Sequence, residues 1–408
     1  MLKPCVQGPF SMRNTNELEL LQVTGITVLS LVVYSSGYKK SILNDFLFCI
    51  VPQYCAIVFP DRIWGLYLCL AMLLNYSGLR KPEGNKSTEV VGYLRFAISV
   101  ITVIAIYAVD FSVFEKRLGK SHFFGISMMD IGVGSFIYNS GIVGYKARSK
   151  RHIRSYLILV LLGFVRCFTV RWFNIGVNPR EYGIYINFYF LLALVNFIYS
   201  LIRSRYNFLL GLLVVTVYEI ILKFSGLTSF IFSDKRETFL EKNKEGLVAT
   251  VPYISILLMT TEVGRICFSE DKTRKKAWKV LGMTAVFGCL YTVFNFSGEG
   301  SRRLGNGAFV FWILALHSFH IGMYLLFEST IALYNPLTAM FCSFNMMFVF
   351  LFSNLIVLFG NVFFDLKSFS TPVAHLNLLS YLVAVFSIPT LLTSRFDLRW
   401  MGLGYRSR

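Results

Sequence analysis

Charged residues, Pro and Asn divide the sequence into a long series of apolar runs. A helix needs about 20 residues, most of them apolar, to cross the hydrocarbon core of a bilayer, where only helices and closed barrels satisfy their backbone hydrogen bonds. The runs are too long for barrel strands and lack the alternation of apolar and polar residues that such strands show. We therefore predict an all-α fold, a polytopic transmembrane helical bundle of about 13 spans. The predicted spans are 20–38, 46–59, 63–77, 92–109, 123–145, 155–173, 185–202, 206–224, 247–268, 278–296, 308–327, 335–360 and 373–393.

The second and third runs are shorter than the others. Only Pro60, Asp61 and Arg62 separate them, so they form either two spans or one re-entrant hairpin. No Pro-rich linker, low-complexity region or internal repeat divides the chain, and we expect residues 1–408 to form a single integral membrane domain. Residues 1–19 contain no uninterrupted apolar core, which predicts that the first span acts as its own insertion signal.

The positive charge of the chain is placed between the apolar runs. Hydrophobic residues make up 55% of the chain, and its formal net charge is +18. Such a charge also occurs in nucleic-acid-binding proteins, but here the basic residues form small loop clusters, such as 146–154 and 271–279. Clusters of Lys and Arg beside membrane spans are retained in the cytosol. The two densest clusters lie on the side of the C-terminal tail, so we expect a cytosolic C-terminus, with the N-terminus and the 110–122 loop in the lumen or outside.

Cysteine and histidine give no clear metal-binding pattern. The eight cysteines form no CxxC pair, and most lie in or beside apolar runs. We interpret them as small packing residues and predict no metal site and no disulfide framework. His317 and His320 are one helical turn apart in the eleventh span, which suits two metal ligands or one general base. Because no carboxylate or Cys is nearby in the sequence, histidines of the core with satisfied hydrogen bonds are the simpler interpretation.

Several polar segments fall on the predicted non-cytosolic side. They are 109–120, 178–188, 241–247 and 296–306. The rule that positively charged loops stay in the cytosol does not explain why ionic loops gather on the opposite side of the membrane. We therefore predict one polar cavity that opens to that side.

Two charged residues of the first of these segments suggest chemistry. Asp110 ends the fourth span, and Lys120 follows in the same short connection, so we expect the two side chains to face one another. A solvated pair at the membrane boundary is one interpretation. In a desolvated pocket, the carboxylate would instead accept a proton from a hydroxyl group while the ammonium stabilises a developing oxyanion.

Asp130 lies at the eighth position of the predicted span 123–145. A carboxylate inside a span is costly, which indicates either a functional group or a buried partner. Asp130 therefore either bonds to a neighbouring helix or binds substrate, and in a lipid or solute transporter it would form an intramembrane site. Arg166 and Arg265 also lie within spans, where they bind an anionic headgroup or pair with Asp130 or Glu262.

The polar segments resemble a known family when they are taken together. The segment AVDFSVFEKRLGK at 108–120, followed by SMMDIGVGSFIYNSGIV at 127–143, is similar to the signature region of the inositol acyltransferases of glycosylphosphatidylinositol (GPI) anchor synthesis. Further similar segments follow in the same order over most of the chain. They are REYGIYINFYF at 180–190, NKEGLVATVPY at 243–253, SRRLGN at 301–306 and FNMMFVFLFSNLIVLFGN at 344–361.

This resemblance implies a thirteen-span enzyme of the endoplasmic reticulum membrane, in which the orientation expected from the basic clusters places the N-terminus in the lumen and the C-terminus in the cytosol. It implies transfer of a long-chain acyl group, typically palmitoyl, from acyl-CoA to the inositol 2-hydroxyl of glucosaminyl-phosphatidylinositol, with no cofactor besides the acyl-CoA co-substrate. Asp110 and Lys120 match the catalytic positions of the family. Other motif positions, which imply substrate binding, are Asp130, Glu181, Tyr182, Asn243, Glu245, Arg302, Arg303, Asn354 and Asn361. His317 and His320 match no motif of the family.

Overall fold

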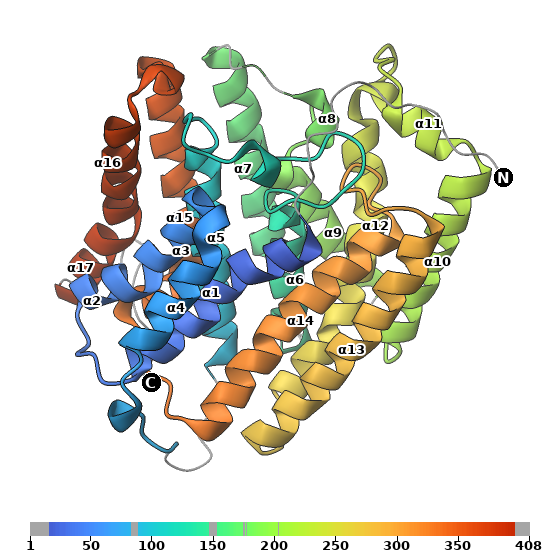
Figure 1. The fold of residues 1–408 in the computed structure, drawn as a ribbon. Coiled ribbons are helices and arrows are strands. Elements are labelled where there is room, and N and C mark those ends of the chain that lie inside the picture. Colours follow the sequence, from blue (N-terminus) through green and yellow to red (C-terminus); the bar gives the residue numbers. More distant parts are fainter. Residues whose placement is uncertain are drawn as a thin grey trace.

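The structure is a computed structural model that describes residues 16–82, 89–146, 153–173, 176, 178–202 and 204–395. Within these ranges the chain folds into helices joined by loops (Figure 1). The helices are α1 (Glu17–Ser35), α2 (Ile42–Asp45), α3 (Val51–Val58), α4 (Ile63–Leu73), α5 (Val90–Ala108), α6 (Ile131–Lys146), α7 (Ile153–Trp172), α8 (Pro179–Tyr182), α9 (Phe188–Ile202), α10 (Asn207–Phe224), α11 (Leu227–Phe232), α12 (Phe239–Cys267), α13 (Thr273–Ser297), α14 (Gly307–Thr330), α15 (Leu337–Phe363), α16 (Thr371–Leu382) and α17 (Ile388–Arg395).

The predicted all-α membrane bundle is confirmed, and each predicted span contains a helix. Among the described residues, 9 helices are long and apolar enough to cross a membrane, or up to 10 if the one bent pair of helices forms a span. The shorter helices, such as α9, do not reach this length. The count of thirteen crossings therefore stays a prediction.

The bent pair is formed by the two short runs that the sequence left open between two spans and a hairpin. The helical segments Ile42–Val58 and Pro60–Leu73 meet at an angle of 114°. At the start of the first segment, the buried carboxylate of Asp45 accepts hydrogen bonds from Thr338 N at 2.8 Å and Thr338 Oγ1 at 3.2 Å. Asp45 thereby caps the N-terminus of α15, where free backbone N–H groups favour a negative charge.

Side-chain caps also fix the starts of α12 and α14. Thr238 and Glu241 form a capping box at the start of α12. Asn306 caps α14, and Glu219 of α10 accepts a hydrogen bond from Gly307 N at 2.8 Å. These bonds occupy donors that a helix start leaves without partners. As a result, the loops before α12 and α14 are held at one end of the bundle.

The predicted span 123–145 is wrong in its first part, because α6 begins only at Ile131. Residues 123–130 form a loop that folds around Asp130. Asp130 Oδ2 accepts hydrogen bonds from Ser121 N at 3.0 Å, Ser127 N at 3.0 Å and Ser127 Oγ at 2.8 Å. Its other oxygen lies 2.7 Å from Nε of Arg302. Asp130 therefore precedes α6, and the apolar residues Ile126 and Met128 of this segment are buried within the protein.

The two ends of the described chain lie at opposite ends of the bundle (Figure 1). The N-terminal end of α1 lies beside the loop after α5, because Arg117 forms an ion pair with Glu19 at 3.1 Å. The last helices, α16 and α17, run from that same end back to the other. We call the end that carries the loop after α5 the polar end.

Removal of one charge of the Asp130–Arg302 pair is expected to destabilise the protein. Asp130→Asn should lower the free energy of unfolding by about 3–5 kcal/mol, because it leaves a buried guanidinium without its counter-charge. Thermal unfolding of the purified protein in detergent measures this loss. The double variant Asp130→Leu/Arg302→Met removes both charges and should recover part of it. Parent-like unfolding of Asp130→Asn would show that this pair does not hold the fold.

Candidate active site

Four polar segments meet at the polar end, as the sequence predicted, although 241–247 forms the start of α12 and is not a loop. The backbone N–H of Gly125 donates to the carbonyl of Gly300 at 2.8 Å, which joins the loops before α6 and α14. The N–H of Ile184 donates to the carbonyl of Lys242 at 2.8 Å, which joins the loop after α8 to α12. Residues far apart in the sequence thus form one polar roof over the bundle, which we define by the segments 109–130, 178–187, 233–247 and 298–306.

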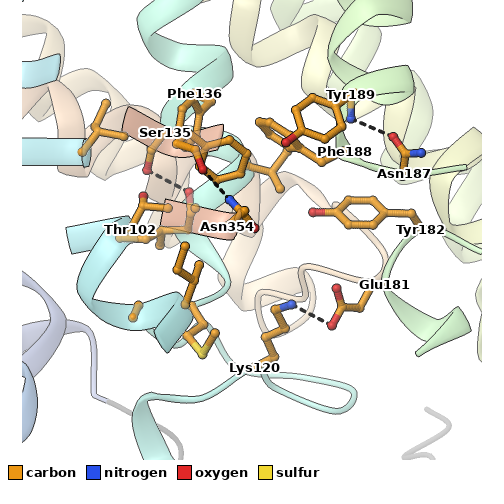
Figure 2. A pocket seen from close by; sticks show the side chains of 18 of the residues that line it. Thr102, Lys120, Ser135, Phe136, Glu181, Tyr182, Asn187, Phe188, Tyr189 and Asn354 are labelled. Carbon is orange, nitrogen blue, oxygen red and sulfur yellow. Dashed lines mark hydrogen bonds and ion pairs between the residues drawn. The ribbon is translucent and has the colours of Figure 1, made fainter. Parts of the chain in front are cut away.

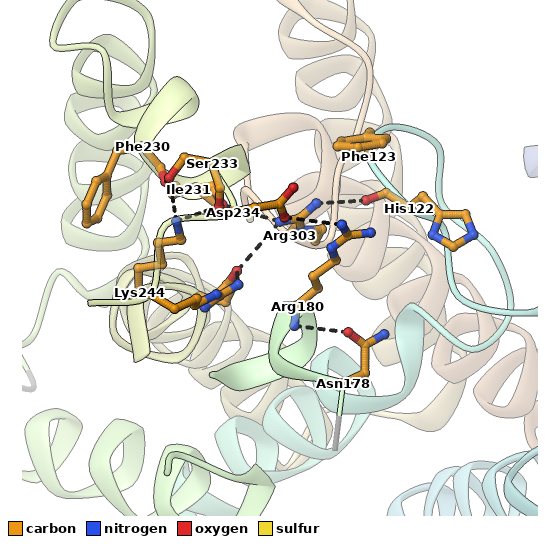
Figure 3. A network of polar contacts seen from close by, with 12 residues as sticks. His122, Phe123, Asn178, Arg180, Phe230, Ile231, Ser233, Asp234, Lys244 and Arg303 are labelled. Carbon is orange, nitrogen blue, oxygen red and sulfur yellow. Dashed lines mark hydrogen bonds and ion pairs between the residues drawn. The ribbon is translucent and has the colours of Figure 1, made fainter. Parts of the chain in front are cut away.

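Two buried ionic clusters hold the roof together. The first is the Asp130–Arg302 pair. The second joins Glu245 to Arg236 through two hydrogen bonds, one of 2.7 Å, and to Arg303 at 3.6 Å. Figure 3 shows Arg303 in this network, where it points toward the backbone of His122. Glu245 is 1% exposed and Arg303 is 3% exposed. A buried carboxylate needs such partners, because burial of an unpaired charge is very costly.

Aromatic rings complete the second cluster. The guanidinium carbon of Arg303 lies 5.4 Å from the centre of the Phe123 ring and 5.0 Å from that of Phe232. Its N–H groups also donate to the carbonyls of His122 and Ile231, at 3.2 and 3.3 Å. Arg303 therefore ties the loop before α6 to α11, in the manner of a cation between two aromatic faces.

A cavity of about 440 Å³ lies beneath the roof. Its polar mouth is formed by Lys120 and Glu181, whose Nζ and Oε1 atoms are 2.6 Å apart (Figure 2). Apolar side chains of α5, α6, α9 and α15 form most of its walls. They are Leu94, Ala97, Ile98, Ile101, Ala105, Ile106, Ile131, Val133, Phe136, Phe188 and Phe350. The cavity is therefore ionic at one end and apolar along its length.

The predicted site residues fall into three groups. Lys120, Glu181, Tyr182 and Asn354 line the cavity. Asp110 and Asn361 contact each other, since Asn361 Nδ2 donates to Asp110 Oδ2 at 2.7 Å, but they are not part of the lining. The remaining residues are buried in the roof and make contacts within the protein: Asp130, Asn243, Glu245, Arg302 and Arg303.

Asn243 shows how the buried group supports the cavity. Its side-chain oxygen accepts hydrogen bonds from the N–H groups of Tyr185 and Ile186, at 2.9 and 3.1 Å. Both of these residues line the cavity. Gly183 has a φ of 105°, and a Cβ atom there would lie 2.5 Å from the Cα of Asn243. The close approach of the two segments therefore requires glycine at this position.

Asp110 and Lys120 have different partners, although the sequence predicted that they face one another. Lys120 is bound to Glu181 and Asp110 to Asn361. Asp110 lies two residues beyond the end of α5, whose last residue in the cavity lining is Ile106. Burial raises the pKa of the Asp110 carboxyl, against the opposing effects of the Asn361 hydrogen bond and the positive charge of Lys367. Asp110 is therefore a stronger base than an ordinary carboxylate.

The structure also decides several alternatives that the sequence left open. Arg265 pairs with Glu262 at 2.7 Å, whereas Arg166 lines the cavity. His317 is hydrogen-bonded to Ser135, and His320 to the carbonyl of Leu316. In the described part of the chain, no group of three or more His, Cys, Asp and Glu side chains could hold a metal ion.

Sequence reasoning missed two polar residues of the cavity mouth. Arg171 of α7 and Asn178 line it together with Arg166. The spacing of Arg166 and Arg171 in an otherwise apolar helix was the available signal. Asp130, in contrast, has all its recorded partners within the roof and is 0% exposed. This arrangement removes the basis for an intramembrane transport site at Asp130.

Comparison with known proteins identifies the family of the chain. The GWT1 family model matches residues 10–392. An uncharacterized protein of Arabidopsis thaliana is 30% identical over 86% of both chains. GPI-anchored wall transfer protein 1 of Kluyveromyces lactis is 30% identical over 86% of this chain and 87% of its own. The phosphatidylinositol-glycan biosynthesis class W protein of Dictyostelium discoideum is 28% identical over 81% of both chains. The chain thus belongs to the GWT1 family, which confirms the resemblance to the acyltransferases of GPI-anchor biosynthesis that its motifs predicted.

Proposed function

We propose that this protein transfers a long-chain acyl group, of the palmitoyl class, from acyl-CoA to the inositol 2-hydroxyl of glucosaminyl-phosphatidylinositol. The family acts in GPI-anchor biosynthesis. The observation that carries the finer proposal is the cavity beneath the roof, which combines an ionic mouth with apolar walls. An acyl chain fits such walls, since about 0.8 kcal/mol is gained for each buried methylene, and the thioester carbonyl would then lie at the mouth.

The cations of α7 fit the phosphate groups of the two substrates. Arg166 and Arg171 line the same cavity as Lys120. Guanidinium groups bind phosphate through paired hydrogen bonds. We assign to these two residues the phosphate of the inositol lipid or the phosphates of CoA.

The proposed reaction is an addition to the thioester carbonyl followed by elimination of the thiolate. Asp110 accepts the proton of the inositol hydroxyl, whose oxygen attacks the thioester carbonyl and forms the new C–O bond. Lys120 stabilises the oxyanion that develops on the carbonyl oxygen. The carbonyl then re-forms, the C–S bond breaks, and the departing CoA thiolate takes up the proton from Asp110, which restores the carboxylate. A thioester is already activated, so the enzyme contributes orientation, proton removal and charge stabilisation.

We assign to each of the other motif residues either a contact with substrate or a role that acts through another residue. Tyr182 and Asn354 contact substrate from the cavity wall, and Glu181 orients Lys120 through their ion pair. Asn361 acts through Asp110. The five residues buried in the roof act as positioning residues: Asp130, Asn243, Glu245, Arg302 and Arg303. The sequence predicted that these roof residues bind substrate. We assign them a positioning role instead, because their charged groups and amides form contacts with other groups of the protein.

Substitution of the two proposed catalytic residues tests the reaction. Purified protein is mixed with labelled palmitoyl-CoA and glucosaminyl-phosphatidylinositol, and the acylated lipid is measured. Asp110→Asn should lower kcat about 10²–10⁴-fold through loss of the base, and Lys120→Met about 10²–10³-fold through loss of the oxyanion partner. Asp365→Asn and Lys116→Met, which change exposed charges of nearby loops, serve as controls. Near-parent turnover of Asp110→Asn or Lys120→Met would remove that residue from the mechanism, and lipid movement without product would indicate a transporter.

The raised pKa of Asp110 predicts the acid side of the pH profile. The base must be deprotonated, so kcat/KM should fall as pH decreases through the pKa of Asp110, above the usual carboxyl value of about 3.9. Asn361→Leu removes a hydrogen bond that lowers this pKa. The acid limb should therefore move to higher pH in Asn361→Leu and stay in place in the control Asp365→Asn. If the acid limb does not move in Asn361→Leu, the titration of Asp110 does not determine the pH profile.

We further propose that the polar end faces the lumen of the endoplasmic reticulum and that the C-terminus is cytosolic. The double substitution Lys235→Asn/Glu237→Thr creates a glycosylation sequon in an exposed part of the roof. This site should be glycosylated in a eukaryotic host, as judged by a mobility shift that an endoglycosidase reverses. The native sequon at Asn85, which lies outside the described residues, should carry no glycan. The opposite pattern would place the cavity mouth in the cytosol.

A further inference from the structure

The inner end of the cavity differs from its apolar walls. Thr24 and Thr27 of α1 and His317 and His320 of α14 line it. These side chains are 3–6% exposed, so they are enclosed by protein on their other sides. We propose that these four residues form a polar floor that sets the longest acyl group the protein transfers. This inference rests on the proposed acyl transfer and adds the residues that determine its chain-length specificity.

Hydrogen bonds fix the side chains of the polar floor. His317 Nε2 lies 2.8 Å from Ser135 Oγ on α6. His320 Nδ1 donates to the carbonyl of Leu316 at 2.7 Å. Thr24 Oγ1 donates to the carbonyl of Leu20 at 2.8 Å. Because their rotamers are held by these bonds, the side chains cannot move aside without the loss of a buried hydrogen bond, which is costly.

A second layer of side chains closes the cavity below the polar floor. Tyr324, one turn beyond His320 on α14, donates from its hydroxyl to Thr27 Oγ1 at 3.1 Å. Its ring centre lies 5.6 Å from that of Tyr93 on α5. Both tyrosines are 2% exposed. A longer acyl chain therefore meets packed protein.

The length of the cavity suits a long acyl chain. On α5 the lining runs from Ile106, near the mouth, to Leu94, near the polar floor. This separation corresponds to about 18 Å along a helix axis. A chain that stops short of the polar floor leaves apolar wall unfilled, and each missing methylene should weaken binding about fourfold. A chain that is too long must displace the hydrogen-bonded floor. Shorter and longer chains should therefore both bind less tightly than a chain that just reaches the floor.

Opening the polar floor should favour longer chains. A mixture of saturated acyl-CoAs from myristoyl to arachidoyl is offered to the purified protein with glucosaminyl-phosphatidylinositol, and the acyl groups on the product are measured by mass spectrometry. His320→Ala removes the imidazole and extends the cavity. The ratio of product with two additional methylenes to product with the parent's preferred chain should rise about tenfold.

Partial filling of the cavity should favour shorter chains. Gly132 of α6 lines the cavity, and a Cβ atom placed on it meets nothing within 4 Å. Gly132 lies one helical turn nearer to the roof than Ser135, so a larger side chain there would enter the chain's path. Gly132→Leu should therefore move the preferred acyl group to a shorter chain. Gly288→Leu is the matched control, because Gly288 of α13 is equally open but is not part of the lining.

The outcomes separate the two proposals. Absence of an acylated product from the parent protein would contradict the proposed function itself. Normal product with the same chain-length profile in His320→Ala and Gly132→Leu would overturn the polar floor while the acyl transfer stands. Opposite shifts in these two variants, with no shift in Gly288→Leu, are the expected result. If His320→Ala fails to fold, the Gly132→Leu result decides whether this cavity holds the acyl chain, and His317→Ala replaces His320→Ala as the test of the floor.

Discussion

The buried ion pair between Asp130 and Arg302 is the contact on which the polar end depends. Two charges lose their hydration when they are buried, and the loss is offset only when every oxygen and N–H group finds a partner. Here the N–H groups of Ser121 and Ser127 complete the shell of the carboxylate. The pair joins the residue just before α6 to the loop just before α14. It therefore fixes where both helices start, and both helices supply walls of the cavity.

Much of the fold could be predicted because its main determinant is local. A long apolar run must become a helix in a bilayer, and each predicted run contains one. The error at 123–130 arose because burial under protein loops and burial in lipid select the same apolar residues. Only the partner of Asp130 distinguishes the two cases, and Arg302 lies 172 positions away in the sequence. The bend of 114° between the second and third apolar runs likewise depends on packing that hydropathy does not report.

The candidate site was predictable as a set of residues but not as a set of roles. Motif similarity brought together residues that line the cavity, such as Lys120 and Glu181, and residues that hold its roof, such as Asn243 and Glu245. Both kinds are polar residues in loops, so composition and spacing do not separate them. What separates them is where the hydrogen bonds go: Asn243 uses its amide on the backbone of Tyr185 and Ile186, while Lys120 holds its ion pair at the cavity mouth. The cavity lining also includes Arg171, which no motif contained.

Helix α7 relates the cavity to the surrounding bilayer. It packs mainly on α9, where Gly163 allows a close approach to Phe190. Its large apolar side chains are exposed, including Phe164 at 62% and Trp172 at 72%, as expected for a surface in contact with lipid. Other residues of the same helix, Arg166 and Arg171, line the cavity. One helix thus presents aromatic groups to the membrane and cations to the site. In the proposed reaction, a lipid that arrives within the membrane would meet these cations as its phosphate reaches the cavity, and its inositol ring would then lie near Lys120 and Asp110. The position of the phosphate would orient the hydroxyl for transfer, because a headgroup anchored by two guanidinium groups has few orientations left.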